Sequence, residues 1–219
     1  MNTQNKWLNT TVEAYIKYFG VKESPVVYEV GSRDGNDGVE LARRISNDKI
    51  TMKNIVLFEC NPPQINVVKT NYPQATLITD AISDEVGEVE FLQIHGDKNM
   101  VGSSSMDLSR VNESWVQSTS TIKVKTRRLD DVIKELKHQK TEIDVMKIDI
   151  EHYTYEALES LGDYLRNVKV FHLETEPETV ARNKTNLDIA LYMREKGYKC
   201  TALDHEWGDL IQDQVWVRQ

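Results

Sequence analysis

The sequence has no long apolar run, only two cysteines and little positive charge, and each shortage excludes a class of protein. No stretch reaches the roughly 18 consecutive apolar residues that suggest a membrane-spanning helix. Residues 1–20 lack the basic start and the apolar core of a signal peptide. Cys60 and Cys200 lie in apolar, strand-like stretches, which favours reduced and buried thiols. We therefore predict a cytoplasmic protein without disulfides and without a membrane span.

Positive charge is scarce, since 27 lysines and arginines stand against 35 aspartates and glutamates, for a formal net charge of −8. Nucleic-acid-binding proteins usually present a basic face, so we expect no nucleic-acid partner, although a local basic patch is compatible with the total. Hydrophobic residues make up 39% of the chain, which allows a substantial core. The length of 219 residues suits one α/β domain and is thin for two, so we expect a single domain over residues 1–219.

Segments with strand and helix patterns alternate through most of the chain. Five apolar stretches indicate buried strands, at residues 25–31, 54–59, 75–83, 143–150 and 168–176. Apolar residues at helical spacing separate most of them, and a helix within residues 1–22 precedes the first. Two further strand patterns with a short connection end the sequence, which implies antiparallel pairing. This order predicts a mostly parallel sheet with helices on both faces and ligands at the carboxyl ends of the strands.

One region departs from the alternation. Residues 85–94 indicate a turn at Gly87 and a strand that returns from it. The polar stretch from about residue 95 to residue 121 is longer than connections usually are in a compact domain, and such loops are often functional. Residues 121–129 then alternate as a surface strand. We predict a loop and hairpin insertion at residues 95–128 that covers the site of the acceptor substrate.

The first predicted strand ends in a glycine-rich loop, EVGSRDGNDG, at residues 29–38. The loop matches neither the Gly-x-Gly-x-x-Gly turn of dinucleotide-binding proteins nor a P-loop. Glu29, Asp34 and Asp37 make it a poor cradle for a pyrophosphate. Their charge suits a ligand with a positive end, and S-adenosylmethionine carries an ammonium, a sulfonium and no phosphate.

Acids also end the next two strands. Glu59 follows the second strand, where a carboxylate can accept two hydrogen bonds from a ribose diol. Asp80 follows the third and can accept from an adenine amino group, with a backbone N–H on a ring nitrogen. Each acid alone is equally compatible with a solvated strand end. A nicotinamide-dependent dehydrogenase would share the ribose acid but would need the missing glycine turn.

Six stretches in chain order resemble the FkbM family of class I S-adenosylmethionine-dependent methyltransferases, which usually act on hydroxyl oxygen. They are VVYEVGSRDG, FECNP, AISDEVGEVEF, GSSS, RRLDDVI and DVMKIDIEHYTYEAL, and the resemblance runs from about Val26 to Ala202. It implies a Rossmann-like sandwich with a mostly parallel seven-stranded sheet, an antiparallel C-terminal strand and a β-hairpin insertion. We take the cofactor-binding residues to be Glu29, Gly31, Ser32, Asp34, Glu59, Cys60, Asp80, Ala81 and Asp149.

The sequence differs from the family pattern at several positions. Glu29 replaces an aspartate, Arg33 and Asp34 replace small residues, and Cys60 replaces a proline. His152 replaces the glycine after Glu151, so an imidazole could reach into the pocket where the family has only backbone.

The fourth and fifth strands carry the candidate reaction centre. Alternation places Asp149 and Glu151 on one side of a strand, and His172 and Glu174 likewise. We expect Asp149 beside the methionine part of the cofactor, and Glu151 or His152 as the proton acceptor, because a hydroxyl is a poor nucleophile until its proton is taken. The same groups suit a divalent cation. No spacing fixes a metal geometry, so none is predicted.

The acceptor site is expected between these strands and the insertion. Predicted substrate-binding residues are Ser103, Ser104, His172 and Glu174, with Trp115 nearby, and the hydroxyls suit a sugar or another small polyol. A buried ion pair for Lys147 and a hydrogen-bonded core position for His172 remain the plainer interpretations. Ser103 and Ser104 fit a mobile, solvated loop without a binding role nearly as well as they fit a substrate-binding loop.

Three functions stay open at this point: O-methylation of a small hydroxylated acceptor, N-methylation of nucleic acid or protein, and a non-catalytic binding module. Asn61-Pro62-Pro63 resembles the start of the Asn-Pro-Pro-Tyr motif of amino-methylating enzymes. That motif follows the fourth strand, whereas these residues follow the second, and Gln64 replaces the aromatic residue. The sequence therefore favours O-methylation.

Overall fold

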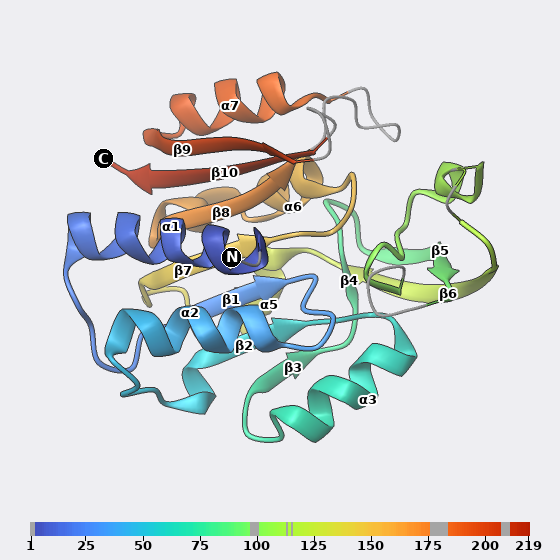
Figure 1. Ribbon diagram of the computed structural model, residues 1–219, viewed down its shortest axis with the longest axis horizontal. Helices are drawn as coiled ribbons and strands as arrows, with labels where there is room; N and C mark the ends of the chain where they lie inside the picture. Colours follow the sequence, from blue (N-terminus) through green and yellow to red (C-terminus); the bar gives the residue numbers. More distant parts are fainter. Residues whose placement is uncertain (1–2, 97–100, 113, 115, 176–183, 207–210) are drawn as a thin grey trace.

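A seven-stranded sheet forms the centre of the computed structural model (Figure 1), which describes residues 3–96, 101–112, 114, 116–175, 184–206 and 211–219. The strand order is β3 (Thr76–Ile78), β2 (Ile55–Phe58), β1 (Val27–Val30), β7 (Ile143–Ile148), β8 (Val168–Thr175), β10 (Ile211–Arg218) and β9 (Tyr198–Glu206). The pairs from β3 to β8 are parallel, and β10 is antiparallel to both neighbours. The predicted fold class is confirmed.

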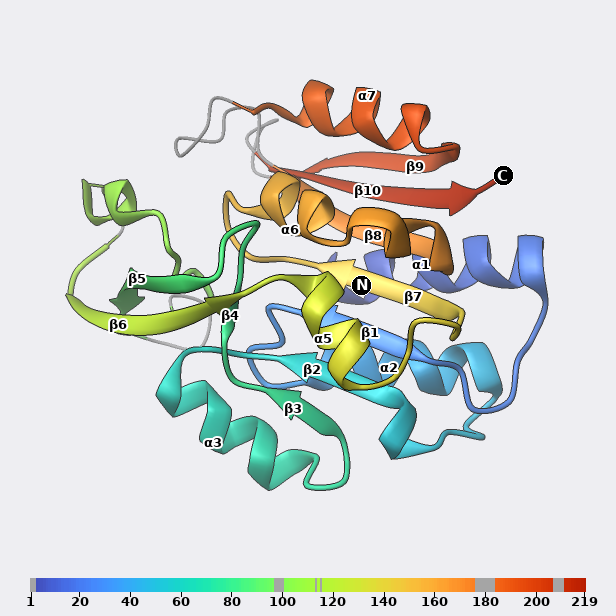
Figure 2. The same ribbon diagram turned by 180° about the vertical axis from the view of Figure 1, so that it is seen from behind.

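Helices cover both faces of this sheet, as the two opposite views show (Figures 1 and 2). One face carries α1 (Thr3–Phe19), α2 (Asn36–Ser46) and α3 (Pro62–Asn71), and the other carries α5 (Leu129–Glu135), α6 (Thr154–Ser160) and α7 (Asn186–Glu195). Short 3-10 helices lie at η1 (Met52–Asn54), η2 (Leu108–Asn112) and η3 (Gly162–Asn167). Within the described ranges, no helix has the length and apolar character needed to cross a bilayer.

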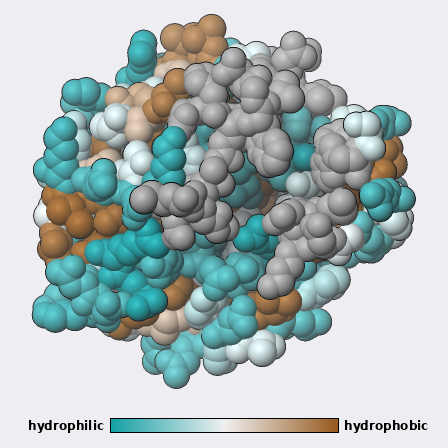
Figure 3. Space-filling view, in the orientation of Figure 1, coloured by the Kyte–Doolittle hydropathy of each residue, from teal (hydrophilic) through white to brown (hydrophobic). Residues whose placement is uncertain are grey.

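Each central strand is buried on both faces and feeds two cores. Val145 of β7 packs with the α1–α2 side, whereas the next residue, Met146, packs with the α5–α6 side. Every residue of β1, β2 and β7 is buried, which explains why these segments read as continuous apolar runs. The surface outside is mostly hydrophilic on the face shown in Figure 3, with hydrophobic residues in separate patches.

The strand after the turn at Gly87 pairs with a different strand from the one that the sequence suggested. The segment 75–83 divides into β3 and β4 (Ala81–Ile82), and β4 joins β5 (Gly87–Ile94) and β6 (Thr119–Arg127) in a second sheet of order β4-β6-β5. Thus β5 pairs antiparallel with β6 and does not return along β3. On one face of this pair Phe91 lies opposite Ile122, and on the other Glu90 lies opposite Lys123. Apolar and opposite-charge pairs both stabilise a ladder, which favours this partner.

Asp144, near the start of β7, ties α1 to the sheet. Its buried carboxylate accepts hydrogen bonds from Tyr15 Oη at 2.7 Å, Lys22 Nζ at 2.6 Å, Val26 N at 2.8 Å and Lys169 Nζ at 3.0 Å. Burial acts to raise the pKa of Asp144, but these donors outweigh it and hold the pKa below its ordinary value. The carboxylate is therefore charged, and its hydrogen bonds serve to hold the fold together.

We expect Asp144→Asn to lower the free energy of unfolding by about 3–5 kcal/mol at pH 7, because two lysines lose their buried counter-charge. Urea denaturation measures this, and the exposed Asp163→Asn serves as the matched control. The contribution of Asp144 is present above the pKa of the unfolded chain and is lost as the pH falls through the lower folded pKa. The two unfolding curves should therefore converge in acid, and equal stabilities at pH 7 would refute the role.

Candidate active site

A cavity of about 200 Å³ opens at the carboxyl ends of β1, β2 and β7. The loops after these strands line it, together with Asp80 and Ala81 between the two sheets and residues 101–106 of the insertion. Most of the predicted site residues lie here, and two do not, as described below. The cavity is therefore where the sequence pattern placed it, at the carboxyl edge of the parallel strands.

The loop between β1 and α2 approaches the end of β7 very closely. Gly31 has φ +86°, and a Cβ atom there would lie 1.8 Å from the carbonyl oxygen of Asp149, so only glycine fits. Glu29 is buried and its Oε2 accepts from Gly38 N at 3.0 Å, at the start of α2. Ser32 donates its hydroxyl to Phe58 O at 2.9 Å. Glu29 and Ser32 line the cavity, but their hydrogen bonds are to the backbone of β1, β2 and α2.

Glu59 lies at the end of β2 with its carboxylate held by backbone donors. It accepts from Arg33 N at 2.8 Å and from Asn61 N at 2.7 Å. Burial raises the pKa of Glu59 to about 7, against the opposing effect of these N–H groups. Cys60 follows it into the lining, where burial raises the pKa of the thiol and keeps it protonated. The predicted residues Asp34, Asp80 and Ala81 also line the cavity.

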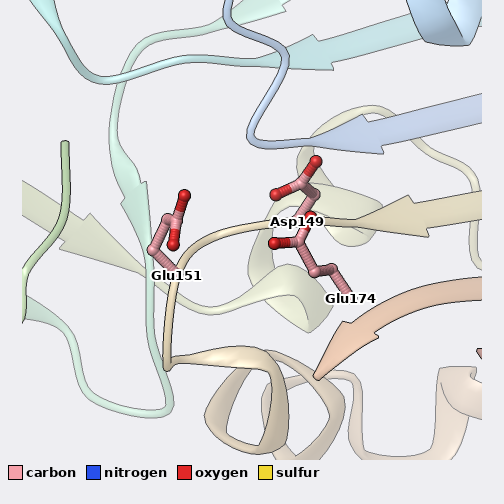
Figure 4. Close-up of side chains that lie close together, drawn as sticks. All are labelled: Asp149, Glu151 and Glu174. Atoms are coloured by element: carbon pink, nitrogen blue, oxygen red, sulfur yellow. The ribbon is translucent and has the colours of Figure 1, made fainter. Parts of the chain in front are cut away.

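Three carboxyl groups meet at the ends of β7 and β8. Asp149, Glu151 and Glu174 each offer an oxygen within 4.8 Å of the others, and Figure 4 shows Asp149 and Glu174 side by side with Glu151 on the adjoining loop. Asp149 also accepts from Lys147 Nζ at 2.7 Å, and the same ammonium lies 2.9 Å from Asp37. Lys147 therefore forms the buried ion pair that the sequence suggested.

Asp149 and Glu174 share a hydrogen bond, and their pKa values move apart. Burial acts to raise the pKa of Asp149, but Lys147 and the bond with Glu174 outweigh it and keep the pKa low. Burial, followed by Asp149 and Glu151, raises the pKa of Glu174 well above its ordinary range. These opposite directions favour a pair that keeps one proton, on Glu174. A divalent cation at this cluster would have to displace that proton and the partner of Glu151.

Glu151 is held by the insertion. Arg110 of η2 pairs with its carboxylate, and Ser105 Oγ donates to its carbonyl oxygen at 2.9 Å. Glu151 and His152 have φ values of +48° and +72°, the left-handed region that favours glycine. The family has glycine at the position of His152 because glycine adopts this left-handed backbone conformation without strain. Arg110 was not foreseen, because one arginine in a polar loop carries no sequence signal.

His152 and His172 do not line the cavity. His152 Nδ1 lies 3.8 Å from Asp107 Oδ2 of the insertion. His172 is buried, with Nδ1 3.1 Å from Thr11 Oγ1 and Nε2 2.9 Å from Asp213 Oδ1. Both ring nitrogens of His172 are thus used in joining α1, β8 and β10. The prediction that His172 binds substrate is corrected to the hydrogen-bonded core position, and the structure gives His152 no place at the cavity.

The predicted substrate residues Ser103, Ser104 and Glu174 do line the cavity. Ser104 Oγ accepts from Ile94 N at 3.0 Å and donates to Val101 O at 2.9 Å, so it anchors the segment to β5. Asn61, which the sequence did not mark as a positioning residue, accepts from Gln93 Nε2 at 2.7 Å. Trp115 and part of the predicted cover over residues 95–128 lie outside the described residues.

The shared proton predicts opposite effects for two matched substitutions. Because Glu174 stays protonated when folded, the wild-type protein loses stability as pH rises above the pKa of the unfolded glutamate. Glu174→Gln has no such loss, so its stability relative to wild type should increase by up to about 1.4 kcal/mol per pH unit.

Asp149→Asn should instead destabilise the fold at pH 7, since Lys147 keeps one partner fewer. Urea denaturation from about pH 5 to about pH 8 measures both variants. A Glu174→Gln variant that loses stability relative to wild type with rising pH contradicts the protonated state.

Comparison with known proteins agrees with this geometry. The family model described as "Methyltransferase FkbM domain" matches residues 29–200. Magnesium protoporphyrin IX methyltransferase from Synechocystis PCC 6803, solved with bound S-adenosylmethionine, has a TM-score of 0.51 at 10% identity, over 99% of this chain and 80% of that one. The METTL16 methyltransferase domain has a TM-score of 0.55 at 9% identity, over 99% of this chain and 68% of that one.

At such low identities the two structures show the shared fold alone. No curated protein matches the sequence significantly. The family match covers most of the chain, including the loops after β1, β2 and β7 that line the cavity. The protein therefore belongs to the FkbM family of S-adenosylmethionine-dependent methyltransferases.

Proposed function

We propose that the protein transfers the methyl group to a hydroxyl oxygen of a small acceptor, with a sugar or glycan precursor as the leading class. One observation carries the proposal. Asp149, Glu151 and Glu174 place their oxygens within 4.8 Å of one another, at the end of the cavity beside β7 and β8. Carboxyl oxygens at that place can accept hydrogen bonds from an acceptor hydroxyl and take its proton.

The residues of the cavity fit S-adenosylmethionine. At Gly31 only backbone lies against the carbonyl oxygen of Asp149, because a Cβ atom there would lie 1.8 Å from it. Glu59 is held by two N–H groups in a fixed position, where it can accept from a ribose diol. Asp80, Ala81 and Cys60 line the adjoining space expected for the adenine. We assign Glu29, Ser32 and Asp34 to shaping this loop and its charge.

S-adenosylmethionine supplies an electrophilic methyl group on a sulfonium. The chain has to align the acceptor oxygen with it and exclude water. We assign Ser103 and Ser104, which line the cavity on the insertion, to orienting the acceptor, with Ser104 as an acceptor of hydrogen bonds because its own proton is donated to Val101 O. As the oxygen–methyl bond forms, the sulfur–methyl bond breaks and its electron pair stays on sulfur, which leaves S-adenosylhomocysteine. The proton on the oxygen becomes acidic at the same time, so Asp149 can accept it despite a low pKa. Glu151 is paired with Arg110 and orients the acceptor rather than serving as the base.

The Asn61-Pro62-Pro63 segment does not favour nitrogen as the acceptor. The prolines occupy the first turn of α3, where a missing N–H costs little. Asn61 is buried and its amide oxygen is bonded to Gln93. The loop after β7, which carries the Asn-Pro-Pro motif in amino-methylating enzymes, has Asp149 and Glu151 here.

We expect incubation of a metabolite extract with the protein and S-adenosylmethionine to add one methyl group to hydroxylated small molecules. Mass spectrometry reports the acceptor, and isotope-labelled cofactor confirms the source of the methyl group. Asp149→Ala should abolish the product, whereas Asp163→Asn should retain it. Oligonucleotides and peptides tested in parallel should stay unmodified. Methylation of a nitrogen in either one, without any hydroxylated product, overturns the proposal.

Cofactor affinity should depend on pH through Glu59. Its carboxylate must be ionised to accept two ribose hydrogen bonds, and its pKa is about 7. We expect the affinity for S-adenosylhomocysteine, measured by calorimetry, to rise roughly tenfold from about pH 6 to about pH 8. Glu59→Gln should bind more weakly with a flat profile, and the exposed Glu90→Gln should match wild type. A flat wild-type profile would contradict the assignment.

A further inference from the structure

Arg33 differs from the other basic group of the cavity in how its side chain is bonded, although its charge acts on Asp37 and Glu59 nearby. Among the residues that line it, the basic ones are Arg33 and Lys147, and all other charged ones are carboxylic acids. Lys147 is paired with Asp37 and Asp149. In the part of the chain that the structure describes, the guanidinium of Arg33 forms no hydrogen bond or ion pair, and only its backbone N–H is bonded, to Glu59. The cavity thus contains one cation whose donors are not taken.

The Arg33 side chain reaches from the loop after β1 to the insertion, which both line the cavity. It starts from the loop after β1 and runs along Gly102 of the insertion, where an added Cβ would lie 3.2 Å from Arg33 Cδ and 3.6 Å from Nη1. Ser103 and Ser104 follow Gly102 directly and also line the cavity. Arg33 is half-buried, and its side chain lies beside the segment of the insertion that lines the cavity.

The backbone at Arg33 is strained. Its φ is +51°, in the left-handed region that glycine and asparagine tolerate and longer side chains disfavour. A glycine or an asparagine would satisfy this loop at lower cost. A long cation held in a strained conformation at the wall of a ligand cavity points to a role in binding rather than in folding.

We propose that Arg33 is an anion-binding residue of the cavity, for a carboxylate or phosphate group of a bound ligand. A guanidinium can donate two parallel hydrogen bonds to either group, and its charge offsets the repulsion that the acidic lining exerts on an anion. Two sources share this chemistry: the carboxylate of the cofactor's methionine part, and an acidic group on the acceptor. The second source deepens the proposed function, since it makes the hydroxylated acceptor an anionic one.

Binding measurements test the proposal without any methyl acceptor, so their outcome is independent of the proposed O-methylation. The variants are Arg33→Gln and Arg33→Asn, with Arg33→Lys as the conservative change. Arg43→Gln, an exposed arginine on α2, is the matched control. Calorimetry gives affinities for S-adenosylhomocysteine and for 5′-methylthioadenosine, which lacks the amino-acid group. It also measures inorganic phosphate binding to the protein saturated with S-adenosylhomocysteine.

If the anion is the cofactor's carboxylate, Arg33→Gln and Arg33→Asn lose about tenfold or more in affinity for S-adenosylhomocysteine and none for 5′-methylthioadenosine. If it belongs to the acceptor, both nucleoside affinities stay unchanged and phosphate binding is lost. In either case Arg33→Lys retains part of the affinity.

Arg33→Asn should also melt no lower than wild type, because asparagine tolerates this backbone, so a loss of binding cannot be assigned to unfolding. Affinities equal to those of Arg43→Gln for all three probes overturn the proposal.

Discussion

The Lys147 ammonium is the interaction on which the site depends. It lies under the cavity, 2.7 Å from an oxygen of Asp149 and 2.9 Å from one of Asp37. Glu29 lies opposite Lys147 in the register of β1 and β7, so β1, α2 and β7 each bring a carboxyl group to one place. Burial acts to lower the pKa of Lys147, yet Asp149, Asp37 and Glu29 raise it well above its ordinary value. Such a buried network adds little net stability. Replacing any one member would nevertheless lower the free energy of unfolding strongly, because a charged partner would stay buried without its counter-charge.

The second sheet completes the cavity through a small set of bonds between distant segments. Arg110 and Ser105 hold Glu151, and Gln93 holds Asn61 at the start of α3. These contacts also stabilise the left-handed backbone at Glu151 and His152, which would otherwise be costly. The insertion is thus bonded to the loop after β2 and to the loop after β7. Substitutions in the insertion should therefore alter the positions of Asn61 and of Glu151.

Features that depend only on the ends of strands could be predicted from the sequence. Glu59 and Asp149 end strands that read as buried, and parallel strands bring those ends to one edge whatever their exact register. The partner of β5 could not be predicted so easily, because the opposition of Glu90 to Lys123 becomes visible only with the register. The partners of His172 lie on α1 and β10, at separations of 161 and 41 residues, and no local pattern connects them. The roles assigned to the lining residues remain proposals.

The balance of charge at the reaction end follows from the chemistry of methyl transfer. A sulfonium loses its positive charge as the methyl group leaves, so a strongly negative surrounding would stabilise the reactants more than the transition state. The three carboxyl groups beside β7 and β8 are each offset: Asp149 by Lys147, Glu174 by its proton, and Glu151 by Arg110. They can therefore act as hydrogen-bond acceptors for a hydroxyl without holding the cofactor in its charged form. If the proposed methyl transfer takes place here, Lys147 and Arg110 would contribute to it by offsetting negative charge near the sulfur, although Arg110 does not line the cavity.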